Sequence, residues 1–141
     1  MRTLAALAFV VALAGCGETQ DAATGPGGGA GTTAEPATSL TVAVMPNGTE
    51  APSMEYTLEC DPVGGTHPLP EDACKALAAH PEALEPVPAD SACTMQFGGP
   101  DQATITGTFE GEPVNAQFNR AGGCEIARWD ALAPMFKIVV S

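Results

Sequence analysis

The chain has 141 residues, with 5 basic and 17 acidic side chains and a formal net charge of −12 at neutral pH. This length allows one domain of ordinary size. The negative charge excludes nucleic acid and anionic lipid headgroups as partners, because both would repel the chain. We expect a protein partner that is neutral or basic near the contact.

An apolar run from Leu4 to Ala14 follows the single positive charge of Arg2. The run is shorter than the roughly 20 residues that cross a bilayer, so it predicts a signal peptide over residues 1–15 and export of the chain. The chain has five cysteines. An exported protein with an odd number of cysteines has one left over after disulfide pairing.

The tetrapeptide Leu13-Ala14-Gly15-Cys16 resembles the bacterial lipoprotein box, in which cleavage leaves the cysteine N-terminal and lipid-modified. We therefore expect a lipid on Cys16 that holds the chain durably at the outer face of the cell membrane, since more than one acyl chain is attached. Membrane contact would be through this lipid only. The alternative is an ordinary signal peptide that contains a cysteine.

Residues 16–38 are expected to form the lipid anchor and a flexible linker, because Gly, Ala and Thr dominate and almost nothing there can pack. Such a linker reaches about 25 Å. Residues 39–141 are expected to form the folded domain. Four cysteines remain for two disulfides in an oxidising compartment: Cys60, Cys74, Cys93 and Cys124.

Alternating apolar and polar residues predict five short strands in the domain, at 40–45, 54–60, 103–109, 114–119 and 135–140. Pro46-Asn47-Gly48 is typical of a turn between the first two strands, and residues 110–113 of a turn between the next two. The prolines and glycines of residues 61–73 predict an irregular loop.

Residues 73–80 predict a helix, with Glu71 and Asp72 placed where a first turn favours negative charge. Residues 126–132 predict a short helical turn. The fold class is therefore α+β, with one five-stranded antiparallel sheet covered by one longer and one short helix.

The sequence indicates no cofactor site and no metal site. His67 and His80 lack the short ligand pairs of a zinc site, and we expect His67 to be a loop residue hydrogen-bonded to backbone groups. No nucleophile and base pair is discernible, so we do not expect an enzyme.

The stretch from Cys93 to Phe97 is the candidate site. It places the apolar Met95 at the centre of a short segment that begins at a cysteine and is followed by Gly98-Gly99. An exposed apolar side chain in such a loop is what a protease reads as a substrate.

A longer motif points to a known family. Cys60 opens a string that resembles the signature of the Streptomyces subtilisin inhibitor family: a cysteine, a proline two residues on, a glycine, His-Pro, Ala-Cys and a leucine. The matching residues are Cys60, Pro62, Gly65, His67, Pro68, Ala73, Cys74 and Leu77. The similarity continues at Cys93-Thr94-Met95, at Gly111 and at Cys124-Glu125.

The resemblance implies disulfides Cys60–Cys74 and Cys93–Cys124, a five-stranded antiparallel sheet with two helices, and a homodimer joined through the sheets. It also implies an inhibitor of subtilisin-like or chymotrypsin-like serine proteases. Met95–Gln96 would be the reactive bond, and Thr94 and Phe97 would flank it in the reactive loop.

A second hypothesis is a non-inhibitory binding lipoprotein of the cell envelope on the same scaffold. Two differences from the usual family residues motivate it, the Gly98-Gly99 pair and Gly122. Thr94 is a third difference, where the family often has proline, and it makes the approach to the reactive bond less rigid.

Overall fold

The structure is a computed structural model that describes residues 35–49 and 54–137. The chain divides into two units, residues 1–35 and 36–141, and all described residues except Glu35 belong to the second. The predicted signal peptide, Cys16 and all but the last residues of the linker lie outside the described residues.

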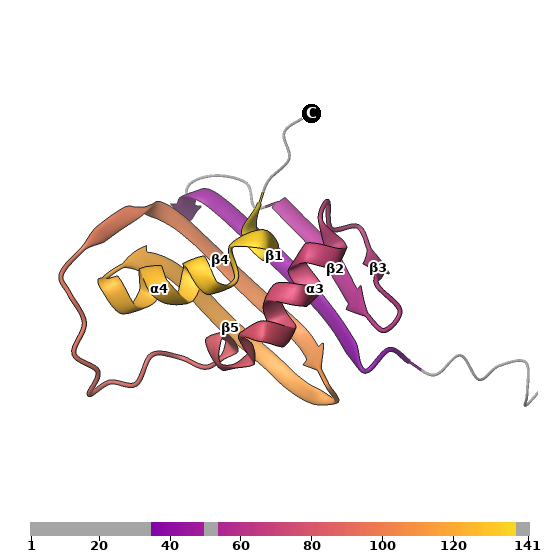
Figure 1. Ribbon diagram of the computed structural model, residues 1–141. Helices are drawn as coiled ribbons and strands as arrows, with labels where there is room; N and C mark the ends of the chain where they lie inside the picture. Colours follow the sequence, from indigo (N-terminus) through magenta and orange to yellow (C-terminus); the bar gives the residue numbers. More distant parts are fainter. Residues whose placement is uncertain (1–34, 50–53, 138–141) are drawn as a thin grey trace, which may run out of the picture. The chain divides into compact units, whose positions relative to one another are not determined.

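One antiparallel sheet organises the second unit (Figure 1). Its strands are β1 (Thr38–Thr49), β2 (Met54–Cys60), β3 (Gly64–Gly65), β4 (Phe97–Phe109) and β5 (Glu112–Ala121). The strand order is β3-β2-β1-β4-β5, with every pair antiparallel. The class predicted from the sequence is confirmed.

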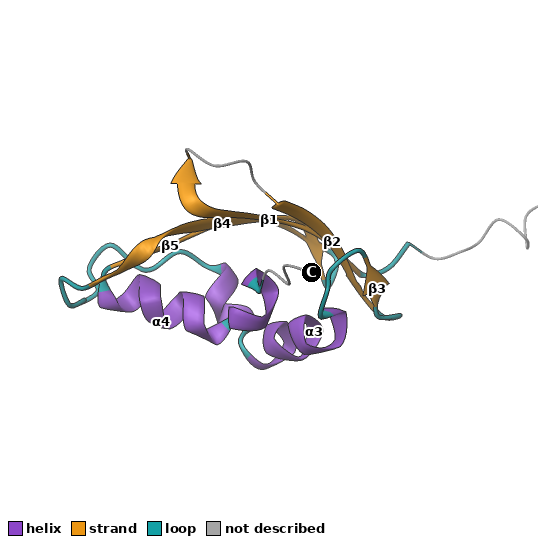
Figure 2. Ribbon diagram, turned by 90° about the horizontal axis from the view of Figure 1, so that it is seen from above, coloured by secondary structure: helices purple, strands orange, loops and turns teal. Residues whose placement is uncertain are grey.

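Among the described residues, all helices lie on one face of this sheet, and none lies over the other face, called the open face below (Figure 2). They are α3 (Pro70–Ala79), α4 (Gly123–Ala131) and two 3₁₀ helices, η2 (Pro81–Leu84) and η3 (Ala133–Phe136). Helix α3 begins at Pro70, earlier than predicted, because a first-turn residue needs no hydrogen-bonded amide and proline supplies the helical φ. Glu71 and Asp72 lie in its first turn as expected.

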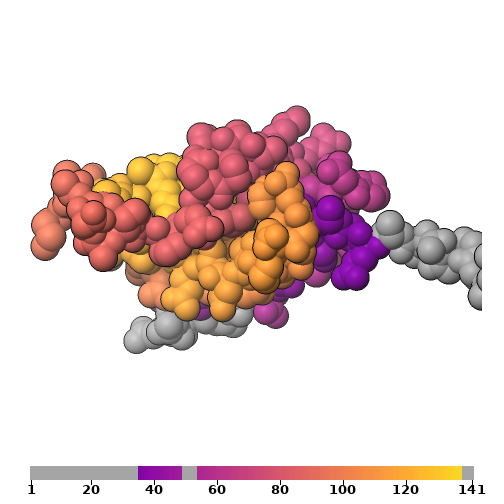
Figure 3. Space-filling model, turned by 90° about the horizontal axis from the view of Figure 1, so that it is seen from below, coloured from indigo at the N-terminus to yellow at the C-terminus, as the bar shows by residue number. Residues whose placement is uncertain are grey.

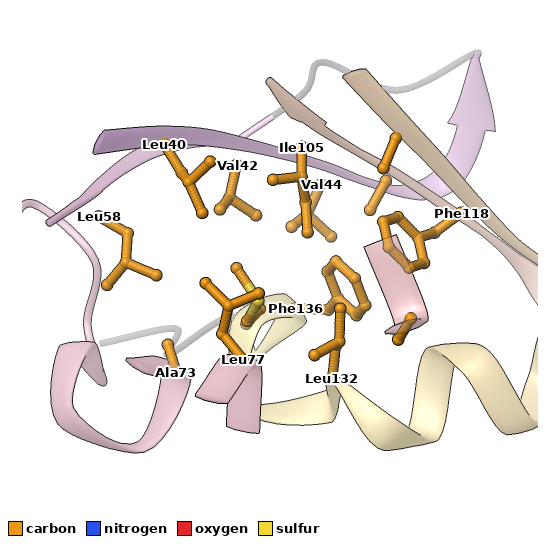
Figure 4. Packing of buried hydrophobic residues seen from close by; sticks show 14 of the residues in the cluster. Leu40, Val42, Val44, Leu58, Ala73, Leu77, Ile105, Phe118, Leu132 and Phe136 are labelled. Atoms are coloured by element: carbon orange, nitrogen blue, oxygen red, sulfur yellow. The ribbon is translucent and has the colours of Figure 1, made fainter. Parts of the chain in front are cut away.

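The core lies between the helices and the covered face of the sheet (Figure 4). Alternate residues of each strand face it, since successive side chains of a strand point to opposite faces. Leu40, Val42 and Val44 of β1 and Ile105 of β4 meet apolar side chains of the helical layer, which include Leu77, Leu132, Met135 and Phe136. Burial of a leucine-sized side chain contributes about 1.5–3 kcal/mol.

The predicted strand at 135–140 is wrong where the structure describes it. Met135 and Phe136 end helix η3, and 138–140 lies outside the described residues. Both side chains are buried, whereas a strand would turn one of them outward. Pro134 in the first turn also favours the helical start.

The fifth strand is instead Gly64–Gly65, inside the loop that we expected to be irregular. It pairs with Leu58 and Glu59 of β2. Gly65 has a φ of +100°, and the backbone of Thr57 occupies the space that a Cβ atom would need. Only glycine fits this close approach.

The predicted turn at Pro46-Asn47-Gly48 is also wrong, because β1 continues through Thr49. Gly48 is buried, and a Cβ atom there would lie 3.4 Å from the carbonyl oxygen of Pro100. Strand β4 begins at Phe97 rather than near residue 103, and its Pro100 is the residue that lies beside Gly48. The connection to β2 falls in 50–53, outside the described residues.

His67 is buried and bonded to backbone groups, as predicted. Its Nε2 lies 3.0 Å from the carbonyl oxygen of Met135, and its Nδ1 accepts a hydrogen bond from the Leu69 amide at 3.0 Å. The side chain therefore joins the loop before α3 to helix η3.

Candidate reactive loop

Residues 85–96 connect η2 to β4 without a helix or strand and run beside α4 (Figure 1). In the space-filling view, the salmon-coloured segment before β4 protrudes at one end of the domain (Figure 3). Met95 is 103% exposed and Phe97 is 73% exposed, whereas Met135 is 0% exposed. The predicted site residue Met95 is thus fully available to a partner.

Two backbone hydrogen bonds hold the residues on either side of Met95. The Gly123 amide donates to the carbonyl oxygen of Thr94 at 2.9 Å, and the Gly122 amide donates to the carbonyl oxygen of Gln96. The carbonyl groups before and after Met95 are therefore fixed to the turn that leads into α4. The Met95 carbonyl lies between them at the predicted reactive bond.

The glycines in this turn have specific steric reasons. Gly122 has a φ of +97°, in the region that favours glycine. A Cβ atom on Gly123 would overlap the hydroxyl of Thr94. The structure thus braces the loop through main-chain amides, without a side chain at position 122.

A disulfide holds the loop just before Met95. Cys93 and Cys124 are bonded with a Cα–Cα distance of 5.3 Å, and the second disulfide joins Cys60 and Cys74 at 5.9 Å. These are the two bridges that the resemblance implied. Cys124 is the second residue of α4, so the bridge, like the two amide bonds, attaches the loop to the start of this helix.

The segment after Met95 enters the sheet directly. Phe97 pairs with Ala121 of β5, and the regular register resumes at Gln102 opposite Asn119 after an irregularity. Gly98 lies within this irregular part, where a Cβ atom would come within 3.0 Å of Ile126. The Gly98-Gly99 pair is therefore packed against α4 and β5.

An ion pair supports the same region. Arg120 of β5 lies 3.1 Å from Asp101 of β4, with both side chains 30% exposed, and its guanidinium lies 5.9 Å from the Trp129 ring. Ion pairs near the surface contribute about 0–1 kcal/mol, so this partly exposed pair adds little beyond the backbone contacts that hold the loop. Glu82, in η2 before the loop, has a pKa below its ordinary value, chiefly through a backbone hydrogen bond and secondarily through His80.

Within residues 35–49 and 54–137, no group of three or more His, Cys, Asp or Glu side chains is arranged to hold a metal ion. In the same part of the chain, no helix is long and apolar enough to cross a membrane.

Comparison with known proteins identifies the family. The model of the family described as "Subtilisin inhibitor-like" matches residues 34–121. The chain belongs to the subtilisin inhibitor-like family. The match includes both cysteines of the first disulfide, Met95 and strands β1 to β5.

Two relatives illustrate the similarity. The chain is 33% identical over 88 residues to subtilisin inhibitor-like protein 1 of Streptomyces cacaoi, which covers 58% of this chain and 79% of that protein. It is 24% identical, with a TM-score of 0.46, to Streptomyces caespitosus sermetstatin in a crystal structure with Bacillus licheniformis subtilisin, covering 71% of this chain and 97% of the sermetstatin chain.

Sequence reasoning missed the brace at Gly122 and Gly123, because main-chain hydrogen bonds leave no side-chain signal. It also missed Arg128, which bonds the segment before the loop. The available signal was an arginine four residues after Cys124 on the predicted helix, beside the apolar Ile126 and Trp129.

Proposed function

We propose that this protein inhibits subtilisin-like serine proteases by presenting Met95–Gln96 as the reactive bond. The observation that carries the proposal is the full exposure of Met95 between two carbonyl groups that are fixed to the start of α4. Membership of the subtilisin inhibitor-like family supports the inhibitory activity. The activity is inhibition, and the protease supplies the catalytic groups.

Preorganisation explains tight binding. A flexible peptide loses about 1–2 kcal/mol per residue when its backbone is ordered in an active site. Thr94, Met95 and Gln96 are already held, so ordering three residues would save about 3–6 kcal/mol, or a factor of roughly 10² to 10⁴ in affinity. The unbranched Met95 side chain would enter an apolar primary pocket.

The same contacts explain why cleavage would achieve little. After cleavage of Met95–Gln96, the new carboxyl end would stay attached through the Cys93–Cys124 bridge and the Gly123 amide. The new amino end would stay attached through Gly122 and the pairing of Phe97 with Ala121. The amine therefore remains close to the acyl-enzyme and competes with water for it.

Titration of subtilisin with the purified chain tests the proposal. We expect stoichiometric inhibition, its loss in Met95→Gly, and full inhibition in Val63→Gly, which removes another exposed apolar side chain outside the loop. Digestion of the chain without a lag, or inhibition that survives Met95→Gly, would contradict the assignment. Protease binding without inhibition would favour the non-inhibitory binding lipoprotein instead.

The anchor is a separate proposal. A lipid on Cys16 and a linker to residue 38 would hold the folded domain, residues 39–141, outside the cell at the membrane surface. The apolar run and the lipoprotein-like tetrapeptide in the sequence support it. Metabolic labelling with a fatty acid should mark the chain and should fail for Cys16→Ser; labelling that persists in this variant would refute the anchor.

A homodimer through the open face of the sheet is the third proposal. This face carries short, half-buried side chains at its centre, including Thr41, Ala43 and Thr104, and none of the helices in residues 35–49 and 54–137 lies over it (Figure 2). Short side chains would let two such faces approach closely. Sedimentation of the chain should give a dimer and that of Ala43→Lys a monomer, because lysine would place charge in the contact. A monomer in the unmodified chain would exclude it.

A further inference from the structure

Arg128 is a buried cation that bonds three segments of the chain. Its side chain belongs to α4 and the residue is 9% exposed. Its Nε donates to the carbonyl oxygen of Ala83 at 2.7 Å, and one terminal nitrogen donates to the carbonyl oxygen of Gln117 at 2.7 Å. The same nitrogen lies 3.2 Å from a carboxylate oxygen of Glu125.

Two further contacts complete this environment. The guanidinium carbon lies 4.0 Å from the centre of the Phe118 ring, and the other terminal nitrogen lies 3.5 Å from the carbonyl oxygen of Leu84. A buried charge is stable only when its donors are satisfied. Arg128 meets this condition with backbone carbonyls from η2 and β5, which ties these segments to α4.

Arg128 and Cys124 are four residues apart on α4, so they lie on the same side of the helix, one turn from each other. Cys124 holds Cys93 through the disulfide, and Arg128 holds Ala83 and Leu84. Residues 85–92 run between these two attachments. Both ends of the segment that leads into the reactive bond are thus attached to one helix.

We infer that Arg128 is a positioning residue for the reactive loop, holding its entry at Ala83 and Leu84 as the disulfide holds its end at Cys93. The inference rests on the proposed function. Ala83 is also buried in the core and Leu84 packs against it, so without Arg128 the entry would keep these apolar contacts and lose its hydrogen bonds to α4. The carboxyl end formed on cleavage would then move away more often, and hydrolysis would gain over resealing.

The role needs the forked arginine head rather than positive charge alone. A guanidinium presents five donors in a fixed plane, whereas a lysine ammonium is a point charge on a flexible stem. Arg128→Lys keeps the charge opposite Glu125, but it cannot reach the carbonyls of Ala83 and Gln117 with the same geometry. Arg128→Met keeps the apolar stem and removes every donor.

Hydrogen exchange of residues 84–92 tests the attachment without reference to any protease. We expect faster exchange there in Arg128→Lys and Arg128→Met than in the unmodified chain. Leu77→Ala is the control, because Leu77 is a buried residue of α3 whose loss lowers the melting temperature. Unchanged exchange in both arginine variants, or an equal increase in the control after correction for its melting temperature, would overturn the inference.

Kinetics with subtilisin test the positioning role. In the arginine variants we expect hydrolysis of Met95–Gln96 in the complex to be at least about tenfold faster, since the loss of even one charged hydrogen bond has an effect of this size. The association rate should change less than twofold. Faster exchange with unchanged hydrolysis would make Arg128 a structural residue only. If the unmodified chain does not inhibit at all, the proposed function fails, and the exchange data still decide the attachment.

Discussion

The Gly123 amide donates a hydrogen bond to the carbonyl oxygen of Thr94 at 2.9 Å, immediately before the predicted reactive bond. This contact joins the loop to the first residue of α4. No side chain fits at position 123, because a Cβ atom there would overlap the Thr94 hydroxyl.

Gly123→Ala should weaken inhibition and increase cleavage of the loop. The added methyl group would displace Thr94 and lengthen its hydrogen bond, at a cost of about 1–3 kcal/mol to the ordered loop. Titration and mass spectrometry of the complex would measure both effects. The double variant Thr94→Ala/Gly123→Ala removes the opposing hydroxyl and should recover part of the loss; no recovery would place the effect elsewhere.

Met95→Lys should redirect inhibition. A lysine at this fully exposed position would suit a protease with an acidic primary pocket and would pay a desolvation cost in an apolar one. Inhibition constants should show stronger inhibition of trypsin and weaker inhibition of subtilisin by Met95→Lys than by the unmodified chain. Val63→Lys, another exposed apolar position, should leave both constants unchanged. A preference that does not respond to residue 95 would contradict its placement at the reactive bond.

The two disulfides should have separable roles. Their loops span 14 and 31 residues, so each bridge contributes on the order of 3–4 kcal/mol to stability in the chain-entropy model. Cys60→Ser/Cys74→Ser should lower the melting temperature and preserve inhibition below it. Cys93→Ser/Cys124→Ser should lower it to a similar extent and also convert the chain into a substrate. Equal inhibition by both double variants would show that the second bridge does not hold the loop.

Peroxide should inactivate the inhibitor through Met95. The exposed thioether takes one oxygen atom from hydrogen peroxide, and water is released. The sulfoxide that forms is polar and therefore suits an apolar pocket poorly. The buried Met135 should react far more slowly. Mass spectrometry and titration would follow oxidation and activity together. The Met95→Leu variant should inhibit subtilisin and resist peroxide. If peroxide inactivates this variant as fast as the unmodified chain, the effect belongs to another residue.

Much of the fold could be predicted from residue patterns. The alternation in 54–60 and in 103–109 predicted strands that the structure contains, and the acidic first turn predicted α3. The errors occur where distant residues decide. Asn47-Gly48 has turn chemistry, but β1 continues through Thr49, and Gly48 lies close to Pro100 of β4. The predicted strand at 135–140 fails because the neighbouring residues Met135 and Phe136 are both buried in the core.

The sequence by itself determined the fold class, the cysteines available for bridging and an apolar Met95 beside one of them, because periodicity, composition and spacing are local properties. Only the tertiary structure decided how the loop is held. Gly122, Gly123 and Arg128 act by bringing amides and a guanidinium to carbonyl groups that are distant in sequence. Such contacts depend on the packing of α4 against the sheet, and no local pattern of residues encodes that distance.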